Sequence, residues 1–321
     1  MRAPLHPAWV WLPPVSALAA FGLILASGSN QALFLVLNRA GGVLGERAWL
    51  LLTMFGDGAV ALVLVLPSIR RAPHCFWAAL AAAIFAGLWT QMTKQFVDVP
   101  RPLAVFDAGM FFHAGPAYRQ VSFPSGHAAA AFAIAGIGIM GLTRRTPARV
   151  LLLSMAILVS LSRIMIGVHW PVDILWGMIG GWISAWAGLA LHGRSGWGTS
   201  GAGGIAAGLL LLGMAASLLV SRHIGIPAVM PLQRVVAATC LLWGAWEMAA
   251  MLPWPSWLHR HGERLGKPQP ELSGERTKEQ TNERTSERAG ERTGERSGEP
   301  AGERKADTVK AVAIERRAAD G

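Results

Sequence analysis

The sequence predicts an all-α fold, a polytopic bundle of transmembrane helices. Of the 321 residues, 52% are hydrophobic and only 15% are charged, and the mean hydropathy is +0.38. These values are typical of a protein that crosses a membrane several times. Apolar runs also recur along the chain before residue 259, each close to the roughly 20 residues that a helix needs to cross a hydrocarbon core.

Eight such runs are predicted as membrane spans, at about residues 8–27, 48–67, 75–93, 125–142, 150–168, 171–191, 205–220 and 232–252. No clear cleavage site follows the first run, so we expect a retained helix rather than a signal peptide. Residues 28–47 contain several polar side chains and a glycine pair, which predicts an external loop with a short apolar piece at the interface. Cys75 and Cys240 belong to different apolar regions, and we interpret them as packing residues.

Two acidic residues fall inside predicted spans, where an unpaired charge is costly. Asp57, in Gly56-Asp57-Gly58, is expected either to line a lipid path or to pair with an arginine. Glu247 is expected to pair with a basic group or to face a cavity.

The arginine clusters predict the orientation of the bundle. If eight spans alternate, the clusters fall on one side of the membrane: Arg70, Arg71, Arg144, Arg145, Arg149 and Arg194. By the positive-inside rule that side is cytoplasmic, together with both termini. The loop 94–124 and the stretch around His169 then face outward, toward the periplasm if the cell is a Gram-negative bacterium. We therefore predict a multi-pass protein of the bacterial inner membrane.

The composition divides the chain into a transmembrane domain, residues 1–258, and a tail, residues 259–321. The tail holds 14 basic and 13 acidic residues, and from Glu275 it repeats with a period of four, which predicts a low-complexity, disordered cytoplasmic segment. The membrane domain keeps 15 basic against 6 acidic residues. This excess of base indicates anionic lipid or phosphate as a partner, and not nucleic acid, since the sequence has no soluble basic domain.

The stretch 162–173 carries the strongest chemical signal. Pro171 suits the first turn of a helix, which places His169 just before that helix and Asp173 on its first turn. Asp173 can then accept a hydrogen bond from one ring nitrogen of His169 and leave the other lone pair free to attack. Arg163 offers a planar fork for a phosphate. The alternative is an ordinary helix–loop–helix with interfacial polar residues.

Two further stretches have the same character. Pro100 and Pro102 restrict the backbone around Arg101, so that Lys94 and Arg101 can hold one anion from two sides. The alternative for this pair is two basic residues at a membrane interface.

In Phe123-Pro124-Ser125-Gly126-His127, Pro124 suits the first helical position. The N–H groups of Ser125 and Gly126 would then be unpaired at a helix N-terminus, where an anion binds well. His127 is placed to protonate a leaving-group oxygen. The alternative is a simple helix start with an interfacial histidine.

All three stretches are predicted on one membrane face, and together they supply charge compensation, a nucleophile with its orienting group, and a general acid. No carboxylate cluster suited to Mg²⁺ is evident, so a metal-independent mechanism without a cofactor is expected. The three stretches are Lys94-x6-Arg101-Pro102, Pro124-Ser125-Gly126-His127 and Ser162-Arg163-x5-His169-x3-Asp173. They resemble the signature of the type 2 phosphatidic acid phosphatase family, whose superfamily includes bacterial acid phosphatases and vanadium haloperoxidases.

The resemblance covers about residues 48–191 and implies a six-helix phosphatase core, with the last two predicted spans beyond it. It implies that His169 attacks phosphorus to form a phosphohistidine, with Asp173 as its partner and His127 as the acid for the leaving group. It also implies a set of phosphate binders, namely Lys94, Arg101, Ser125, Gly126 and Arg163.

The function expected from this resemblance is hydrolysis of lipid phosphates at the outer face of the membrane. The implied substrates are isoprenoid diphosphates, phosphatidylglycerol phosphate, phosphatidic acid and lipid A phosphates. Two alternatives stay open: a lipid phosphotransferase that uses the same residues, and a non-catalytic transport or scaffold protein that kept the fold. The sequence leaves the head group and the oligomeric state open.

Overall fold

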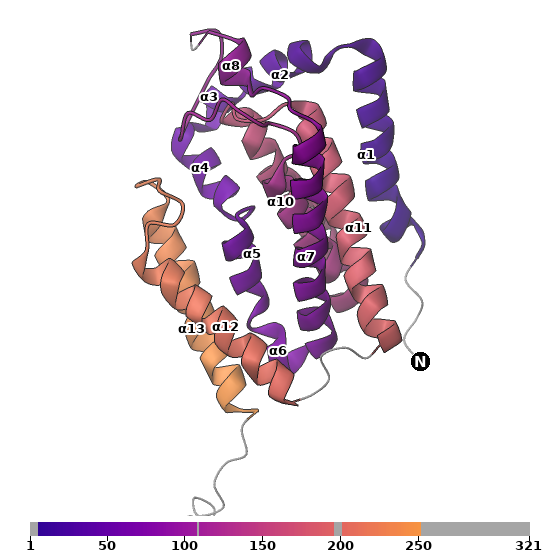
Figure 1. Cartoon of the computed structure of the whole chain (residues 1–321), viewed down its shortest axis with the longest axis vertical. Coiled ribbons are helices and arrows are strands. Elements are labelled where there is room, and N and C mark those ends of the chain that lie inside the picture. The colour runs from indigo at the N-terminus through magenta and orange to yellow at the C-terminus, as the bar shows by residue number, and fades with distance from the viewer. Residues whose placement is uncertain (1–5, 108, 196–200, 252–321) are drawn as a thin grey trace, which may run out of the picture. The chain divides into compact units, whose positions relative to one another are not determined.

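In the computed structural model, residues 6–107, 109–195 and 201–251 are described, and the regular elements of this part of the chain are all helices (Figure 1). In chain order they are α1 (Ala8–Ser27), α2 (Asn30–Arg39), α3 (Gly41–Leu44), α4 (Glu46–Met54), α5 (Gly58–Val65), α6 (Ser68–Arg71), α7 (Pro73–Phe96), α8 (Pro102–Val105), α9 (Gly126–Ile137), the π-helical turn η1 (Gly138–Leu142), α10 (Thr146–Met165), α11 (Pro171–Ser195), α12 (Gly201–Val220) and α13 (Met230–Ala249). The predicted tail, 259–321, lies outside the described residues.

The all-α membrane architecture predicted from the sequence is confirmed. Five described helices are long and apolar enough to cross a membrane: α1, α7, α10, α11 and α12. The pair α4 and α5 makes a sixth span if its two halves are counted together. The remaining two predicted spans are helical, but α9 with η1 is shorter, and α13, which carries Gln233, Arg234 and Glu247, is not among the helices apolar enough by this test. The chain is thus a multi-pass membrane protein.

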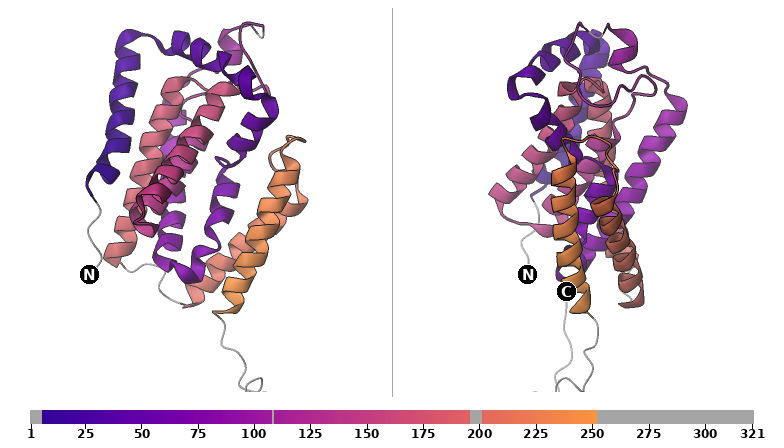
Figure 2. Two further views of the ribbon diagram at one scale, coloured as in Figure 1. Left: turned by 180° about the vertical axis from the view of Figure 1, so that it is seen from behind. Right: turned by 90° about the vertical axis from the view of Figure 1, so that its left-hand side faces the viewer.

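Helix α11 lies between α1 and the rest of the bundle and packs on α9, α7 and α1 (Figure 2). Small residues allow this close approach. A Cβ atom added at Gly181 would lie 2.1 Å from the carbonyl oxygen of Ala129, and one added at Gly188 would lie 2.3 Å from that of Ala78. Small residues at helix contacts bring backbones together in the way that packing within a membrane requires. This packing fixes the start of α11, where His169 and Asp173 lie.

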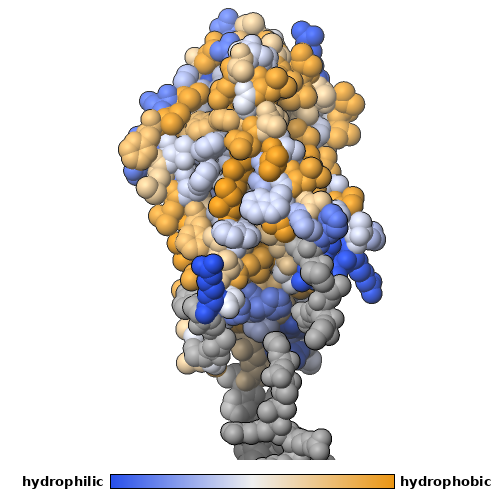
Figure 3. Space-filling view, turned by 90° about the vertical axis from the view of Figure 1, so that its right-hand side faces the viewer, coloured by the Kyte–Doolittle hydropathy of each residue, from blue (hydrophilic) through white to orange (hydrophobic). Residues whose placement is uncertain are grey.

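The outer surface of α1 is apolar, as expected for a helix that faces lipid. Leu12, Leu18 and Leu23 are all more than half exposed. On the side of the molecule where α1 lies, apolar side chains are spread over much of the surface and the most hydrophilic ones lie toward the two ends (Figure 3). Exposed leucines on such a helix are stabilised by hydrocarbon rather than by protein contacts.

The predicted second span, 48–67, is broken. Helices α4 and α5 are bent by 56° at residues 55–57, and Asp57 caps α5 by accepting hydrogen bonds from the N–H groups of Ala59 (3.0 Å) and Val60 (3.1 Å). Of the two expectations for Asp57, pairing with an arginine is wrong, because its carboxylate lies beside His223, with Nε2 3.2 Å from Oδ1. The other, that it lines a lipid path, stays a prediction. Glycines on both sides of Asp57 permit the break.

The predicted external loop at 28–47 is also mostly helical, in α2, α3 and the start of α4. Asn38 explains how this polar segment is held. Its side-chain amide donates to the carbonyl oxygens of Phe112 (2.9 Å) and Ile164 (2.8 Å) and accepts from the N–H of Phe112 (2.7 Å). These bonds tie α2 to the end of α10, and the sequence pattern alone did not reveal them.

Helices α12 and α13 pack on each other and on α5. Glu247 is fully buried and accepts hydrogen bonds from Arg70 (2.7 Å), Arg71 (2.5 Å) and Trp243 (3.1 Å). The expectation that Glu247 pairs with a basic group is confirmed. This ionic contact attaches α13 to α6, at the end of the bundle opposite α8 (Figure 1).

Candidate active site

His169 and Asp173 form a buried pair at the start of α11, as their spacing predicts. His169 lies in the turn before the helix, and its Nδ1 is 3.1 Å from Oδ2 of Asp173. Asp173 also accepts a hydrogen bond from the backbone N–H of Trp170 at 2.9 Å, which is half of a capping box at the helix N-terminus. The same carboxylate therefore starts the helix and orients the ring. The Nε2 atom is left as the nitrogen available to react.

Ser122 is a third member of this group that the sequence reasoning missed. Its hydroxyl is fully buried and donates to Oδ2 of Asp173, and it lies 3.4 Å from Nδ1 of His169. Ser122 is three residues before the Ser125 motif, but its chemistry depends on a contact across 51 residues. A serine at that spacing carried no distinguishing signal.

Arg101 lies against the opposite edge of the ring. Its Nη1 donates to the carbonyl oxygen of Val168 (3.0 Å) and is 3.5 Å from Nε2 of His169. Its Nε donates to the carbonyl oxygen of Gln120 (2.9 Å). The guanidinium also stacks on Tyr118, 5.0 Å from the ring centroid. Arg101 is thus fixed by backbone contacts beside the reactive nitrogen.

The positive groups predicted to bind phosphate do converge on His169. Burial first, and then the charges of Arg101, Arg163, His127 and Lys94, lower the pKa of His169 well below its ordinary value. Desolvation and neighbouring positive charge both disfavour an imidazolium. The ring is therefore neutral at physiological pH, which is the form that holds a lone pair for attack.

The start of α9 differs in detail from the prediction. Helix α9 begins at Gly126, with Ser125 as its N-cap, so Pro124 lies before the helix rather than in its first turn. The N–H of Ser125 donates to the carbonyl oxygen of Asp173 at 3.0 Å, and its hydroxyl accepts from the N–H of Ala128. The expectation of an unpaired Ser125 N–H is wrong, because that group joins α9 to α11. The N–H groups of the first turn, beginning at Gly126, keep the anion-binding character of a helix N-terminus.

Arg163 lies on a small cavity, which we call the polar cavity. It has a volume of about 120 Å³, and its polar lining consists of Thr53, Asp57, Tyr118, His127, Arg163 and His223. Arg163 is buried; its Nη1 donates to the hydroxyl of Thr53 at 2.8 Å, and its Nε has no hydrogen-bond partner. A buried donor without a partner is costly, which indicates that this edge of the guanidinium is kept for a ligand.

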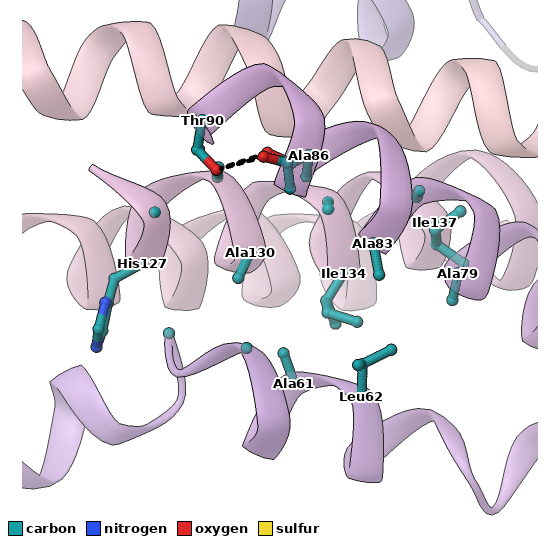
Figure 4. Close-up of a pocket in the computed structure, with 17 residues that line it drawn as sticks. Ala61, Leu62, Ala79, Ala83, Ala86, Thr90, His127, Ala130, Ile134 and Ile137 are labelled. Atoms are coloured by element: carbon teal, nitrogen blue, oxygen red, sulfur yellow. Dashed lines mark hydrogen bonds between the residues drawn. The ribbon is translucent and has the colours of Figure 1, made fainter. Parts of the chain in front are cut away.

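A second cavity adjoins His127 and is almost wholly apolar. This apolar cavity has a volume of about 310 Å³ and is lined by α5, α7 and α9, mainly through alanine and isoleucine side chains (Figure 4). His127 lies at one end of it, and Ile137 lies toward the other. The hydroxyl of Thr90 donates to the carbonyl oxygen of Ala86 (2.9 Å), so it adds little polarity. His127 lines both cavities and therefore marks the place where a polar and an apolar part of one molecule can meet.

The structure thus brings the three motifs to one end of the bundle. Arg101 and Arg163 lie near His169 from different elements, and Lys94, on the last turn of α7, is within electrostatic range of both arginines and of Asp173. Among the described residues, no group of three or more His, Cys, Asp or Glu side chains is placed to hold a metal ion. The catalytic and binding roles of these residues remain predictions.

Comparison with known proteins gives the motifs a context. Residues 75–197 match the PAP2 superfamily. The chain is 30% identical over 153 residues to the lipid A 1-phosphatase of Rhizobium etli, which covers 44% of this chain and 64% of the relative. It is 31% identical over 127 residues to the undecaprenyl-diphosphatase of Sulfolobus acidocaldarius, and this match covers 39% of this chain and 57% of the relative. The matched region thus spans less than two thirds of each relative.

Among solved structures, the crystal structure of Aquifex aeolicus LpxE aligns with a TM-score of 0.46 and 25% identity, covering 50% of this chain and 94% of that one. All three sequence motifs lie within the residues matched to the family, from Lys94 to Asp173. The resemblance predicted from these motifs is confirmed by the match of residues 75–197 to the PAP2 superfamily.

Proposed function

We propose that the protein is an integral-membrane lipid phosphatase that transfers a phosphoryl group from a lipid to His169 and then to water. The observation that carries this proposal is the buried His169, oriented by Asp173 through Nδ1 and flanked by Arg101 at Nε2. The names of the relatives agree with it, since one is a lipid A 1-phosphatase and the other an undecaprenyl-diphosphatase. The proposed substrates are lipid phosphomonoesters or diphosphates.

In the first step, Nε2 of His169 attacks the terminal phosphorus, and the bond from that phosphorus to the leaving oxygen breaks. The leaving oxygen is the ester oxygen of a lipid monophosphate or the bridging oxygen of a lipid diphosphate, which departs as the lipid monophosphate. Arg101 donates to a phosphoryl oxygen in place of its contact with the ring, and the free edge of Arg163 stabilises the charge that develops. The negative charge of the bound phosphate favours the protonated form of His127, which gives its proton to the departing oxygen. Asp173 stabilises the positive charge on the His169 ring through Nδ1–H.

In the second step, His127, now neutral, takes a proton from water as the water oxygen attacks phosphorus. The phosphorus–nitrogen bond breaks, and its electron pair returns to Nε2 of His169. Inorganic phosphate leaves, and both histidines regain their starting states. The arginines and Lys94 supply the positive charge, so this scheme uses no metal ion or cofactor.

The apolar cavity supports a lipid as the substrate. It adjoins His127, the proposed proton donor to the lipid oxygen, and its alanine-rich wall can contact a hydrocarbon chain without a desolvation cost. A water-soluble phosphate ester would leave this cavity unused. The substrate then lies with its phosphate at the end of the bundle and its chain among the helices.

We propose further that the active site faces the outside of an inner membrane. His74 contacts the carbonyl oxygen of Gly141 (3.2 Å), so the start of α7 and the end of η1 share one end of the bundle with their flanking arginines. His169 lies at the other end, where the 97–125 connection also lies. In a background with Cys75 and Cys240 replaced by alanine, an impermeant thiol reagent should label Asp107→Cys but not Thr146→Cys in intact cells. Labelling of position 146 instead would reverse the orientation.

The activity is tested with the purified protein in bilayer discs and a panel of lipid phosphates of the four implied classes. We expect release of inorganic phosphate from at least one of them, inhibition by vanadate, no effect of EDTA, and no release by His169→Ala. Transfer of label to another lipid instead of to water would identify a phosphotransferase. Absence of turnover with every member of the panel would contradict the proposal.

A further inference from the structure

The connection between α12 and α13 contributes to the polar cavity, although it lies outside the residues that match the family. His223, Ile224 and Ile226 line the cavity together with Arg163 and His127. The family match ends at residue 197, before α12 begins. A part of the chain that the superfamily region does not include therefore borders the proposed active site.

Contacts within the C-terminal helices fix this connection. Gln233 on α13 donates from Nε2 to the carbonyl oxygens of Leu218 (2.6 Å) and Ser221 (3.2 Å), and Val229 is fully buried. His223 is then held against the core through Asp57, with its Nε2 3.2 and 3.3 Å from the two carboxylate oxygens. The Gln233 bonds thus hold the backbone that leads to His223, and Asp57 directs its ring.

The groups around the polar cavity favour an anion. Asp57 is its acidic residue, and that carboxylate is already engaged by the first turn of α5 and by His223. Arg163 presents a buried Nε without a partner. When its ring is protonated, His223 donates from both nitrogens, and only Nε2 is directed at Asp57. The other nitrogen is then a donor for an anionic group.

We infer that His223 binds a second anionic group of the substrate, next to the phosphoryl group that reacts at His169. This inference rests on the proposed lipid phosphatase function and refines it. The substrate class that supplies two adjacent anionic groups is a lipid diphosphate. His223 then selects a diphosphate over a monophosphate with the same hydrocarbon chain, and the α12–α13 connection determines specificity.

The test uses farnesyl diphosphate and farnesyl monophosphate, which share one chain and differ by one phosphoryl group. With the full-length protein, His223→Ala should raise the KM for the diphosphate about tenfold, the loss expected for a charge-assisted hydrogen bond at a half-exposed site, and change its kcat less than about twofold. The KM for the monophosphate should stay within about twofold. His223→Arg keeps a cation at the cavity and should restore most of the diphosphate affinity.

Arg222→Ala is the matched control, because it removes a positive charge from the same connection at an exposed residue that does not line the cavity. It should leave both KM values unchanged. Equal losses for the two substrates in His223→Ala, or no loss, would overturn the inference and assign His223 to holding Asp57.

Ligand-induced thermal stabilisation gives a second measurement that does not need turnover. The wild type should be stabilised more by the diphosphate than by the monophosphate, and His223→Ala should lose that difference. If the wild type binds both compounds but hydrolyses neither, the proposed function is wrong. The difference in thermal stabilisation between the two compounds still tests the inference about His223. If the two compounds stabilise the wild type equally, the inference is wrong even if the enzyme is active.

Discussion

The two ends of the bundle each bury a carboxylate among positive groups, but the two carboxylates differ in how many of their oxygens have hydrogen-bond partners. Glu247 has both oxygens occupied, by Arg70, Arg71 and Trp243. Oδ2 of Asp173 has three hydrogen-bond partners, whereas its Oδ1 has none. The first cluster is complete within the protein, and the second keeps unused hydrogen-bonding capacity.

This difference separates a structural ion pair from a site. Buried polar atoms without partners are destabilising, and a cluster that serves only stability has no reason to keep them. At the His169 end, both Asp173 and Arg163 keep such atoms, and Arg163 borders a cavity. We therefore expect changes at the His169 end to remove activity and changes at the Glu247 end to reduce stability.

The largest effect is expected from His169→Ala, which deletes the attacking atom. Turnover should fall at least about 10⁴-fold, in line with the loss of a nucleophile in other enzymes. His169→Asn should not rescue it, because an amide cannot carry the phosphoryl group. Phosphate release measures this, with membrane insertion and melting temperature as controls. Undiminished turnover in His169→Ala would contradict the assignment of activity to the His169 end of the bundle.

Asp173→Asn should have the next largest effect, a fall in kcat of about 10³–10⁴-fold. The amide leaves the attacking nitrogen in place but cannot stabilise the imidazolium or fix the same tautomer. Ser122→Ala removes one donor to the same oxygen and should cost less, about tenfold. Single-turnover kinetics with a lipid phosphate separates these losses from binding. A larger loss in Ser122→Ala than in Asp173→Asn would contradict the assigned order.

Arg163→Lys should lower kcat about 10²-fold, because an ammonium cannot present the free edge of a guanidinium while also bonding to Thr53. Thr53→Val removes only the hydroxyl that accepts a hydrogen bond from Arg163, and it should reduce kcat by less than about tenfold. Full activity in Arg163→Lys would show that the unpartnered Nε has no ligand.

Glu247→Gln should have the smallest effect on catalysis, with kcat and KM within about twofold of the wild type. The protein should nevertheless melt a few degrees lower, because two arginines lose a charged partner, and their exposure to solvent keeps this loss small. Thermal unfolding and phosphate release on one preparation provide both readouts. A loss of turnover in Glu247→Gln without a change in melting temperature would mean that this end of the bundle also takes part in the reaction.

The sequence was informative where local rules apply. The apolar runs located the long helices, and Pro171 located the start of α11 with His169 and Asp173 at its N-terminus. Prediction was less successful where the structure depends on contacts between distant segments. The pairing of Asp57 with His223, at the break after α4, joins residues 166 positions apart. No periodicity or motif contains that information.

The same limit explains the errors at the site. Ser122 and Thr53 act on Asp173 and Arg163 from other elements, and neither residue type is unusual at its position. The N–H of Ser125 was expected to be free because helix N-termini usually are, but it is used by a carbonyl on α11. Motifs identified which residues carry the chemistry, and packing determined which of their atoms remain available.

The central claim is that the ring of His169 carries the phosphoryl group during the reaction, and a trapped phosphoenzyme tests it most directly. The wild type is mixed with a lipid substrate labelled in the reacting phosphate, quenched within milliseconds in acid or in alkali, and separated from lipid. The account predicts protein-bound label that is stable in alkali, labile in acid and absent from His169→Ala, while Glu247→Gln retains it. Label that is stable in acid, or that persists in His169→Ala, would contradict the account.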